Sequence, residues 1–128
     1  MTARRKEKQS DKRSGWRKGY FAEEFCRLYL LLHGYKILAH RYKTPLGEID
    51  LIARRGKQIA FIEVKARKTS RDGSEAVQEK SMRRIGNAAK LYLSAHPKMN
   101  SCDMRFDVMV VTSFWKRPVW YKNAWQSR

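Results

Sequence analysis

Acidic residues and a lysine alternate with apolar residues in the middle of the chain, over residues 47–67. The charged residues that can act together are Glu48, Asp50, Glu63 and Lys65. Carboxylate oxygens are the ligands that Mg²⁺ and Mn²⁺ prefer, and such an ion polarises a phosphate and lowers the pKa of a bound water. A lysine beside the ion orients that water or offsets developing charge. The pattern therefore predicts a metal site that hydrolyses phosphodiesters, with Asp50 and Glu63 as its main ligands.

A β-hairpin brings these charges together. The segments on either side of Arg55-Gly56 are rich in Ile, Val, Leu and Phe, and this dipeptide is a candidate two-residue turn. Such a turn places Phe61 opposite Asp50 and Glu63 opposite Glu48, so that the charged residues share one face of the hairpin. The opposite face is then apolar and consists of Ile49, Leu51, Ala60, Ile62 and Val64. Carboxylates crowded in this way require a cation, a raised pKa or full exposure to solvent.

The same residues have a simpler interpretation. Glu and Lys two positions apart are common on a solvated strand face, and Glu63-Val64-Lys65 alone is weak evidence for catalysis. The preceding Gly47-Glu48-Ile49-Asp50 strengthens the prediction considerably. The backbone carbonyl of Val64 is a further candidate ligand for the metal.

Five segments of the sequence carry a resemblance to a known family. They are Gly19-x-x-Ala22-Glu23, Gly34-Tyr35-x-Ile37-Leu38, Gly47-Glu48-Ile49-Asp50-Leu51-Ile52-Ala53, Phe61-Ile62-Glu63-Val64-Lys65-x-Arg67 and Glu75-Ala76-Val77-x-x-Lys80. Over residues 15–125 or so, the chain resembles the bacterial YraN-like family of predicted endonucleases. That family is similar in core to archaeal Holliday-junction resolvases and to the restriction-endonuclease-like PD-(D/E)xK superfamily. The resemblance implies an α/β fold with a mixed β-sheet flanked by helices, and a metal-dependent endonuclease acting on DNA, branched DNA included.

The resemblance also implies roles for particular residues. Asp50, Glu63 and Lys65 would be catalytic, with Glu23 and Glu48 as supplementary acids. Glu23 matches a helical glutamate that points into the metal site of relatives; alternatively, it is a first-turn acid that complements the helix dipole. A homodimer is implied by the same analogy, because cleaving opposed strands of a junction requires two sites.

The charge of the chain favours a polyanionic partner. Its 29 Lys and Arg exceed its 12 Asp and Glu, for a net charge of +17. Nucleic acid is the first expectation, with DNA favoured over RNA by the resemblance, and a ribosomal surface, an anionic membrane or an acidic protein as alternatives. No apolar run is long enough to cross a membrane and no signal peptide is evident, so the prediction is a cytoplasmic protein without membrane attachment. The basic residues 1–14 predict a disordered arm and 15–128 a single nuclease-like domain.

Several basic residues are candidates for contacts with phosphates. They are Arg41, Lys43, Arg67, Lys68, Arg71 and Lys80, of which the first two are equally explained as charges that protect an edge strand. Arg83 and Arg84 are expected on an outer basic face. The two cysteines, Cys26 and Cys102, suggest neither a zinc site nor a disulfide, and the three histidines share no spacing that indicates a site.

Hydrophobic periodicity predicts the order helix, three strands, helix, two strands. The first helix spans 19–33 and a strand 35–42 precedes the hairpin; a second helix follows over 75–95 and two strands over 103–112 and 118–125. Asp107 is expected to be a salt-bridged acid at the edge of the core. The C-terminal aromatic residues either cover the open end of the sheet, form a dimer surface or stack on unpaired bases. They are Phe114, Trp115, Trp120, Tyr121 and Trp125.

A second function fits the sequence as well. The chain would be a nucleic-acid-binding module that retains the site without using it, in repair or ribosome-associated work. The presence of all three motif residues, Asp50, Glu63 and Lys65, argues against simple loss of catalysis.

Overall fold

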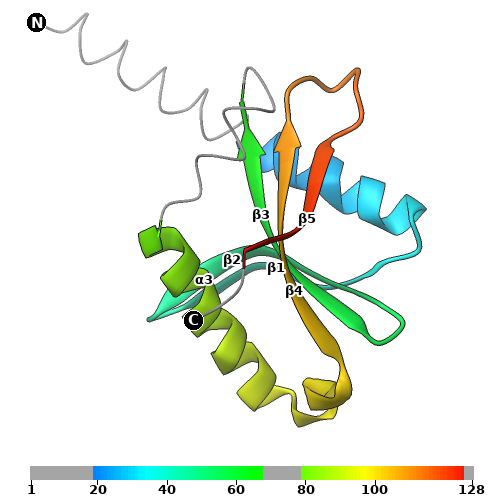
Figure 1. Cartoon of the computed structure of the whole chain (residues 1–128). Coiled ribbons are helices and arrows are strands. Elements are labelled where there is room, and N and C mark those ends of the chain that lie inside the picture. The colour runs from blue at the N-terminus through cyan, green and yellow to red at the C-terminus, as the bar shows by residue number, and fades with distance from the viewer. Residues whose placement is uncertain (1–18, 68–78, 126–128) are drawn as a thin grey trace, which may run out of the picture.

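The computed structural model describes residues 19–67 and 79–125. The described chain begins with a helix over residues 19–32, here called the N-terminal helix. It continues with β1 (Lys36–Thr44), β2 (Gly47–Arg55), β3 (Gln58–Ala66), α3 (Glu79–Ala95), the short 3-10 helix η1 (Pro97–Ser101), β4 (Asp103–Val111) and β5 (Val119–Trp125) (Figure 1). The predicted order of helices and strands is confirmed. The predicted arm over 1–14 and the start of the second helix over 75–78 lie outside the described residues.

The five strands form one mixed sheet in the order β1-β2-β3-β4-β5. Only β3 and β4 pair in parallel; the other neighbours are antiparallel. Parallel neighbours need a long crossover, and α3 lies on the connection between these two strands. The burial of β4 from Phe106 to Val111 follows from its central position, because strands covered on both faces are apolar along their length.

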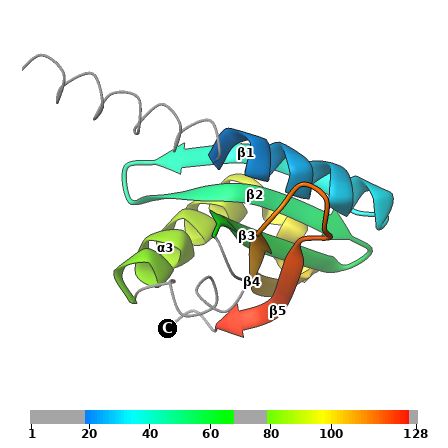
Figure 2. The ribbon, with the colours of Figure 1, turned by 90° about the horizontal axis from the view of Figure 1, so that it is seen from above.

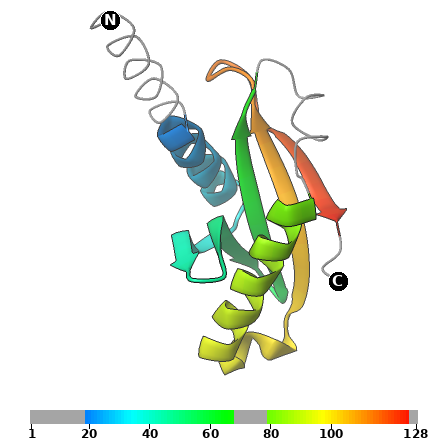
Figure 3. The same cartoon turned by 90° about the vertical axis from the view of Figure 1, so that its left-hand side faces the viewer.

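The helices cover opposite faces of the sheet (Figures 2 and 3). One buried cluster joins Ile52, Phe61 and Val110 to α3 through Ile85 and Tyr92. A second cluster lies under the N-terminal helix and contains Ala22, Cys26, Leu30, Leu51, Ile62 and Met109. Cys26 is fully buried, as its apolar helical surroundings predict. None of the described helices is long and apolar enough to cross a membrane.

The turn between β2 and β3 differs from the prediction. Residues Gly56 and Lys57 form it, and Arg55 pairs with Gln58. Gly56 has φ of +60°, a conformation suited to the first central position of a two-residue turn, whereas the prediction placed it second. The predicted pairings of Asp50 with Phe61 and of Glu48 with Glu63 are therefore wrong. Since each partner moves by two residues, the side chains of β3 keep their predicted faces.

The apolar face predicted for β2 is also interrupted. Ile49 packs in the α3 cluster, whereas Leu51, two residues on, packs under the N-terminal helix. In β1, Arg41 has φ of +53° and lies between the residues that pair with Leu51 and Ile49. Such a conformation is uncommon for a residue with a side chain and breaks the regular pleat. The sheet is thus distorted at the position of Asp50, between Ile49 and Leu51.

The C-terminal aromatic residues divide between two roles. Trp125 is buried against Phe106, and Trp120 and Tyr121 pack on the edges of the two clusters. Asp107 is fully buried and accepts hydrogen bonds from Arg105, Trp120 and the amide of Asn123, which confirms its predicted ion pair in the core. By contrast, Phe114 and Trp115 are exposed in the loop between β4 and β5.

Candidate functional site

Asp50 stands where β2 and β3 separate. Paired residues of the two strands run from Arg55 and Gln58 to Leu51 and Ile62, and Asp50 is the next residue of β2. Here the side chain of Asp50 bonds to the backbone of β3: the amide of Val64 donates a hydrogen bond of 2.8 Å to Oδ2 of Asp50. This bond fixes the carboxylate of Asp50 beside Glu63-Val64-Lys65 on β3.

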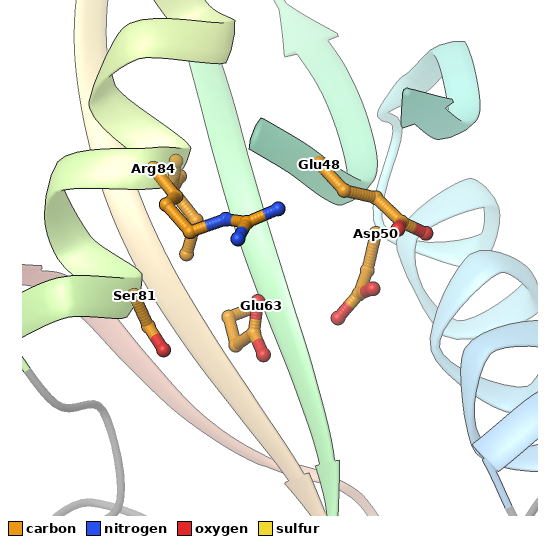
Figure 4. A pocket seen from close by; sticks show the side chains of 6 residues that line it. Glu48, Asp50, Glu63, Ser81 and Arg84 are labelled. Atoms are coloured by element: carbon orange, nitrogen blue, oxygen red, sulfur yellow. The ribbon is translucent and has the colours of Figure 1, made fainter. Parts of the chain in front are cut away.

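A pocket of about 270 Å³ opens at this point between the sheet and α3. It is lined by Glu48 and Asp50 of β2, Glu63 of β3, and Ser81, Arg84 and Ile85 of α3. Figure 4 shows the carboxylates of Asp50 and Glu63 turned toward the same space, with the guanidinium of Arg84 extending over it from the helix. The structure therefore brings together the three acids that the hairpin was predicted to gather, although in a different register.

The electrostatics of Asp50 distinguish it from the other acids. Burial is the main cause that raises its pKa from 3.8 to about 8, followed by repulsion from Glu63 and smaller repulsions from Glu23 and Glu48. The hydrogen bond from Val64 opposes this shift, because it favours the charged carboxylate. A carboxylate held among other carboxylates gains strongly from a nearby cation.

Lys65 lies beside Glu63, as predicted. Its ammonium Nζ is 3.0 Å from Oε1 of Glu63, and the two side chains are only 20% and 16% exposed. The ion pair is largely removed from solvent, so Lys65 is held in place next to the acid at the pocket wall. Its own side chain is not part of that wall.

Glu23 is engaged differently from the prediction. It is buried, and its Oε2 accepts hydrogen bonds from Nε of Arg41 at 2.7 Å and from Nε2 of His40 at 2.9 Å. It does not line the pocket with Asp50, although its charge contributes to the raised pKa of Asp50. The contacts tie the N-terminal helix to β1 and occupy Arg41, one of the predicted phosphate contacts. The sequence context of His40 gives no signal for this bond.

Arg84 is a pocket residue that the sequence pattern did not place at the site. It was expected on an outer basic face, but it lines the pocket together with Ser81, while the predicted accessory Lys80 does not. The reason is the contact of α3 with β2 at Gly47. A Cβ at Gly47 would overlap the carbonyl oxygen of Arg84 and lie 2.6 Å from its carbonyl carbon. The absence of a side chain at Gly47 lets the helix approach and carries Arg84 over the acids.

The remaining predicted phosphate contacts are spread over the molecule. Lys43 is exposed on β1, and Arg67 is exposed at the end of β3, where it lines a second hollow. Lys68 and Arg71 lie outside the described residues. Of these residues, Arg67 follows Lys65 by two positions and is the nearest in sequence to the pocket acids.

The pocket suits a magnesium-like ion held by few protein ligands. Among the described residues, no three His, Cys, Asp or Glu side chains form a ready-made metal cluster. Mg²⁺, however, keeps several waters and is commonly bound by one or two carboxylates together with phosphates of the substrate. Asp50 and Glu63 supply two carboxylates beside a space large enough for waters, so the donor set fits Mg²⁺ or Mn²⁺ better than zinc.

Comparison with known proteins gives the same family from two directions. The model of the uncharacterised protein family UPF0102 matches residues 22–111, which include all the pocket residues. A UPF0102 protein of Chelativorans sp. (strain BNC1) is 46% identical over 123 residues, 95% of this chain and 98% of its own length. A UPF0102 protein of Mesorhizobium japonicum is 41% identical over 93% of this chain and 94% of its own length. A UPF0102 protein of Agrobacterium fabrum is 50% identical over 80% of this chain and 85% of its own length.

Proposed function

Since the chain belongs to the uncharacterised protein family UPF0102, we propose a function from the geometry of its pocket: a metal-dependent endonuclease that hydrolyses phosphodiester bonds in DNA, branched DNA included. The observation that carries the proposal is the meeting of Asp50 and Glu63. They come from separate strands, line one pocket and repel each other enough to contribute to the raised pKa of Asp50. Such crowding is costly without a cation, and it is the arrangement that a metal-dependent hydrolase requires.

The residues around the pocket have separable roles in this proposal. Asp50 and Glu63 hold the ion, with the carbonyl of Val64 and the carboxylate of Glu48 as further ligands. A bound Mg²⁺ or Mn²⁺ polarises the phosphate and lowers the pKa of a water. Lys65 lies 3.0 Å from Glu63, where its ammonium orients the attacking water and offsets negative charge on the phosphate.

Basic residues around Asp50 and Glu63 would bind the substrate. Arg84 reaches the pocket from α3 and is placed to hold a phosphate oxygen, a role for which the planar guanidinium is well suited. Arg67, Lys43 and the net charge of +17 favour further contacts with the nucleic-acid backbone. Glu23 acts through charge, because it is bonded to Arg41 and His40 and yet raises the pKa of Asp50.

The proposal extends to the fold and the assembly. A mixed sheet with acids at the point where two strands part, flanked by helices, is consistent with a restriction-endonuclease-like core. A homodimer would supply the two sites that cleavage of a junction needs.

One observation favours the alternative of a binding module without catalysis. Among the described residues, no three His, Cys, Asp or Glu side chains stand ready to hold a metal ion together, and Glu23 is engaged by Arg41. A protein of this kind would bind DNA through its charge alone, with no dependence on a divalent metal.

Cleavage of end-labelled duplex, flap and four-way-junction DNA tests the proposal. Wild type, Glu63→Gln and the control Glu79→Gln are compared with Mg²⁺, Mn²⁺ or EDTA. Glu79 is an exposed acid in the first turn of α3 and does not line the pocket. The expected result is metal-dependent cleavage by wild type and Glu79→Gln and a loss of at least about 100-fold in Glu63→Gln. Cleavage that survives in Glu63→Gln, or DNA binding without cleavage of any substrate, contradicts the proposal.

A further inference from the structure

A second hollow, of about 530 Å³, lies at the end of β3 and β4. It is lined by Ala66, the last residue of β3, by Arg67 after it, by Val111 at the end of β4, and by Thr112 to Trp115 of the β4–β5 loop. The amide of Arg67 donates a hydrogen bond to the carbonyl of Val111 at 3.1 Å, so the two walls are joined by the backbone. The hollow is therefore part of the sheet framework.

The aromatic residues at its rim are held in a defined arrangement. The ring of Phe114 packs edge-on against Phe25 and Phe21 of the N-terminal helix, with ring centroids 5.5 and 6.5 Å away. In the same loop, the amide of Trp115 donates a hydrogen bond of 3.1 Å to Oγ of Ser113. Phe114 thus anchors the loop, and the loop presents Trp115.

Trp115 itself is 97% exposed to solvent. A large apolar ring displayed at the tip of an anchored loop loses the stabilisation it would gain by burial. Phe114 beside it is also 51% exposed, and adjoining apolar side chains left exposed together are typical of an interaction site. Trp125 and Trp120 pack with the two buried clusters of the described residues, whereas Trp115 belongs to neither cluster.

The charges around Trp115 indicate the chemistry of that partner. Lys116 and Arg117 follow it in the chain and are exposed, and Arg67 lines the hollow from the other side. No acidic residue occurs from Val108 to Lys122. An aromatic face surrounded by cations is suited to an unpaired nucleotide, whose base stacks on the ring while its phosphates meet the cations. A base inside a duplex is already stacked on both sides and gains little here.

The position of the hollow relates it to the pocket. Arg67 directly follows the last residue of β3 and comes four residues after Glu63, which corresponds to about 13 Å of extended chain. That distance is spanned by a few nucleotides of one strand.

We propose that Trp115 and the hollow beside it bind an unpaired base of the nucleic-acid substrate. This inference rests on the proposed function for its purpose, which is to direct cleavage to phosphates next to single-stranded DNA, as in flaps and junctions. The family model ends at residue 111, so Trp115 lies beyond the part of the chain that the model matches, whereas Ala66, Arg67 and Val111 of the hollow lie within it.

Binding in EDTA tests the subsite separately from cleavage. The proteins are wild type, Trp115→Ala, Trp115→Phe and the control Leu32→Ala, which removes another side chain that is 85% exposed. The ligands are a short labelled single strand, the blunt duplex of the same sequence, and an abasic strand of the same length. Fluorescence anisotropy gives the dissociation constants, and light scattering gives the oligomeric state.

We expect Trp115→Ala to weaken single-strand binding by about 5- to 150-fold and to leave duplex binding unchanged. Trp115→Phe keeps most of the affinity, and Leu32→Ala keeps all of it. Wild type should bind the abasic strand as weakly as Trp115→Ala binds the intact strand. On the abasic strand, wild type and Trp115→Ala should have the same affinity. If Trp115→Ala loses affinity for the intact single strand alone and wild type cleaves no DNA, the subsite is supported and only the proposed nuclease activity is contradicted.

The inference is overturned if Trp115→Ala weakens single-strand and duplex binding equally, or not at all. It is also overturned if Trp115→Ala loses as much affinity for the abasic strand as for the intact one, because the ring then contacts no base. A change of oligomeric state without any change in nucleic-acid binding would assign the hollow to a contact between copies of this chain.

Discussion

The backbone of Gly47 lies directly against the carbonyl group of Arg84, with no room for a side chain between them. This contact sets the distance between β2 and the first half of α3. It thereby determines that Arg84 and Ser81 form a wall of the pocket whose other wall carries Asp50 and Glu63.

Substitution of Gly47 by alanine is therefore expected to destabilise the protein. The new Cβ overlaps the carbonyl of Arg84, and the backbone must shift to relieve it, at a cost of about 1–3 kcal/mol. Urea denaturation gives the free energy of unfolding. Gly19→Ala is the matched control, because a Cβ at Gly19 meets nothing within 4 Å. Equal stability of both variants would mean that α3 does not depend on this approach.

The raised pKa of Asp50 predicts how the stability of the metal-free protein depends on pH. Its pKa is about 8 in the folded state and 3.8 without the fold, so between these values the folded protein binds more protons than the unfolded one. The contribution of Asp50 is complete below about pH 4 and is lost as the pH rises through 8. The free energy of unfolding of wild type should fall over this range relative to that of Asp50→Asn, which has no such titration.

Denaturation of both proteins in EDTA at a series of pH values measures the difference. Asp103→Asn removes an exposed acid at the start of β4 and is expected to follow wild type. If the curves of wild type and Asp50→Asn run parallel from pH 4 to 8, Asp50 ionises normally and the crowding of carboxylates in the pocket has little electrostatic effect.

The two cysteines are expected to differ sharply in reactivity. Burial raises the pKa of the Cys26 thiol to about 12, with additional repulsion from Asp50 and Glu23, whereas Cys102 is partly exposed. Since the thiolate is the reactive form, alkylation of the native protein at pH 8 should modify Cys102 and leave Cys26 unmodified until the protein unfolds. Cys102→Ser should then be inert in the native state. Rapid alkylation of Cys26 in that variant would show that the N-terminal helix does not stay packed on the sheet.

Much of the fold follows from local patterns in the sequence. The alternating charges of 47–67 predict the hairpin, because this signal lies within one continuous stretch of the chain. Asp50 and Glu63 line one pocket, in agreement with the prediction, although the regular alternation on which it rested is broken in β2 at Asp50. The exact pairing was wrong because it depends on which position of the turn Gly56 occupies, and a shift of two residues leaves the pattern of faces unchanged.

The rest of the site depends on contacts that no local pattern encodes. Arg84 enters the pocket because a helix packs on Gly47 from 37 residues away in the chain. Glu23 turns to His40 and Arg41 because β1 passes beneath the N-terminal helix, and Arg41 adopts a positive φ that its residue type does not suggest. Distortions of this kind come from the tertiary structure and are common near functional sites.

Binding of Mn²⁺ to the protein without nucleic acid tests the central claim most directly. Titration calorimetry compares wild type, Asp50→Asn and Asp103→Asn, each at a pH above 8, where the Asp50 carboxylate is charged. We expect one class of site in wild type and Asp103→Asn, and a loss of about tenfold or more in affinity in Asp50→Asn. Equal Mn²⁺ binding by all three proteins, or none by wild type, would contradict the assignment of Asp50 and Glu63 as ligands of a catalytic metal.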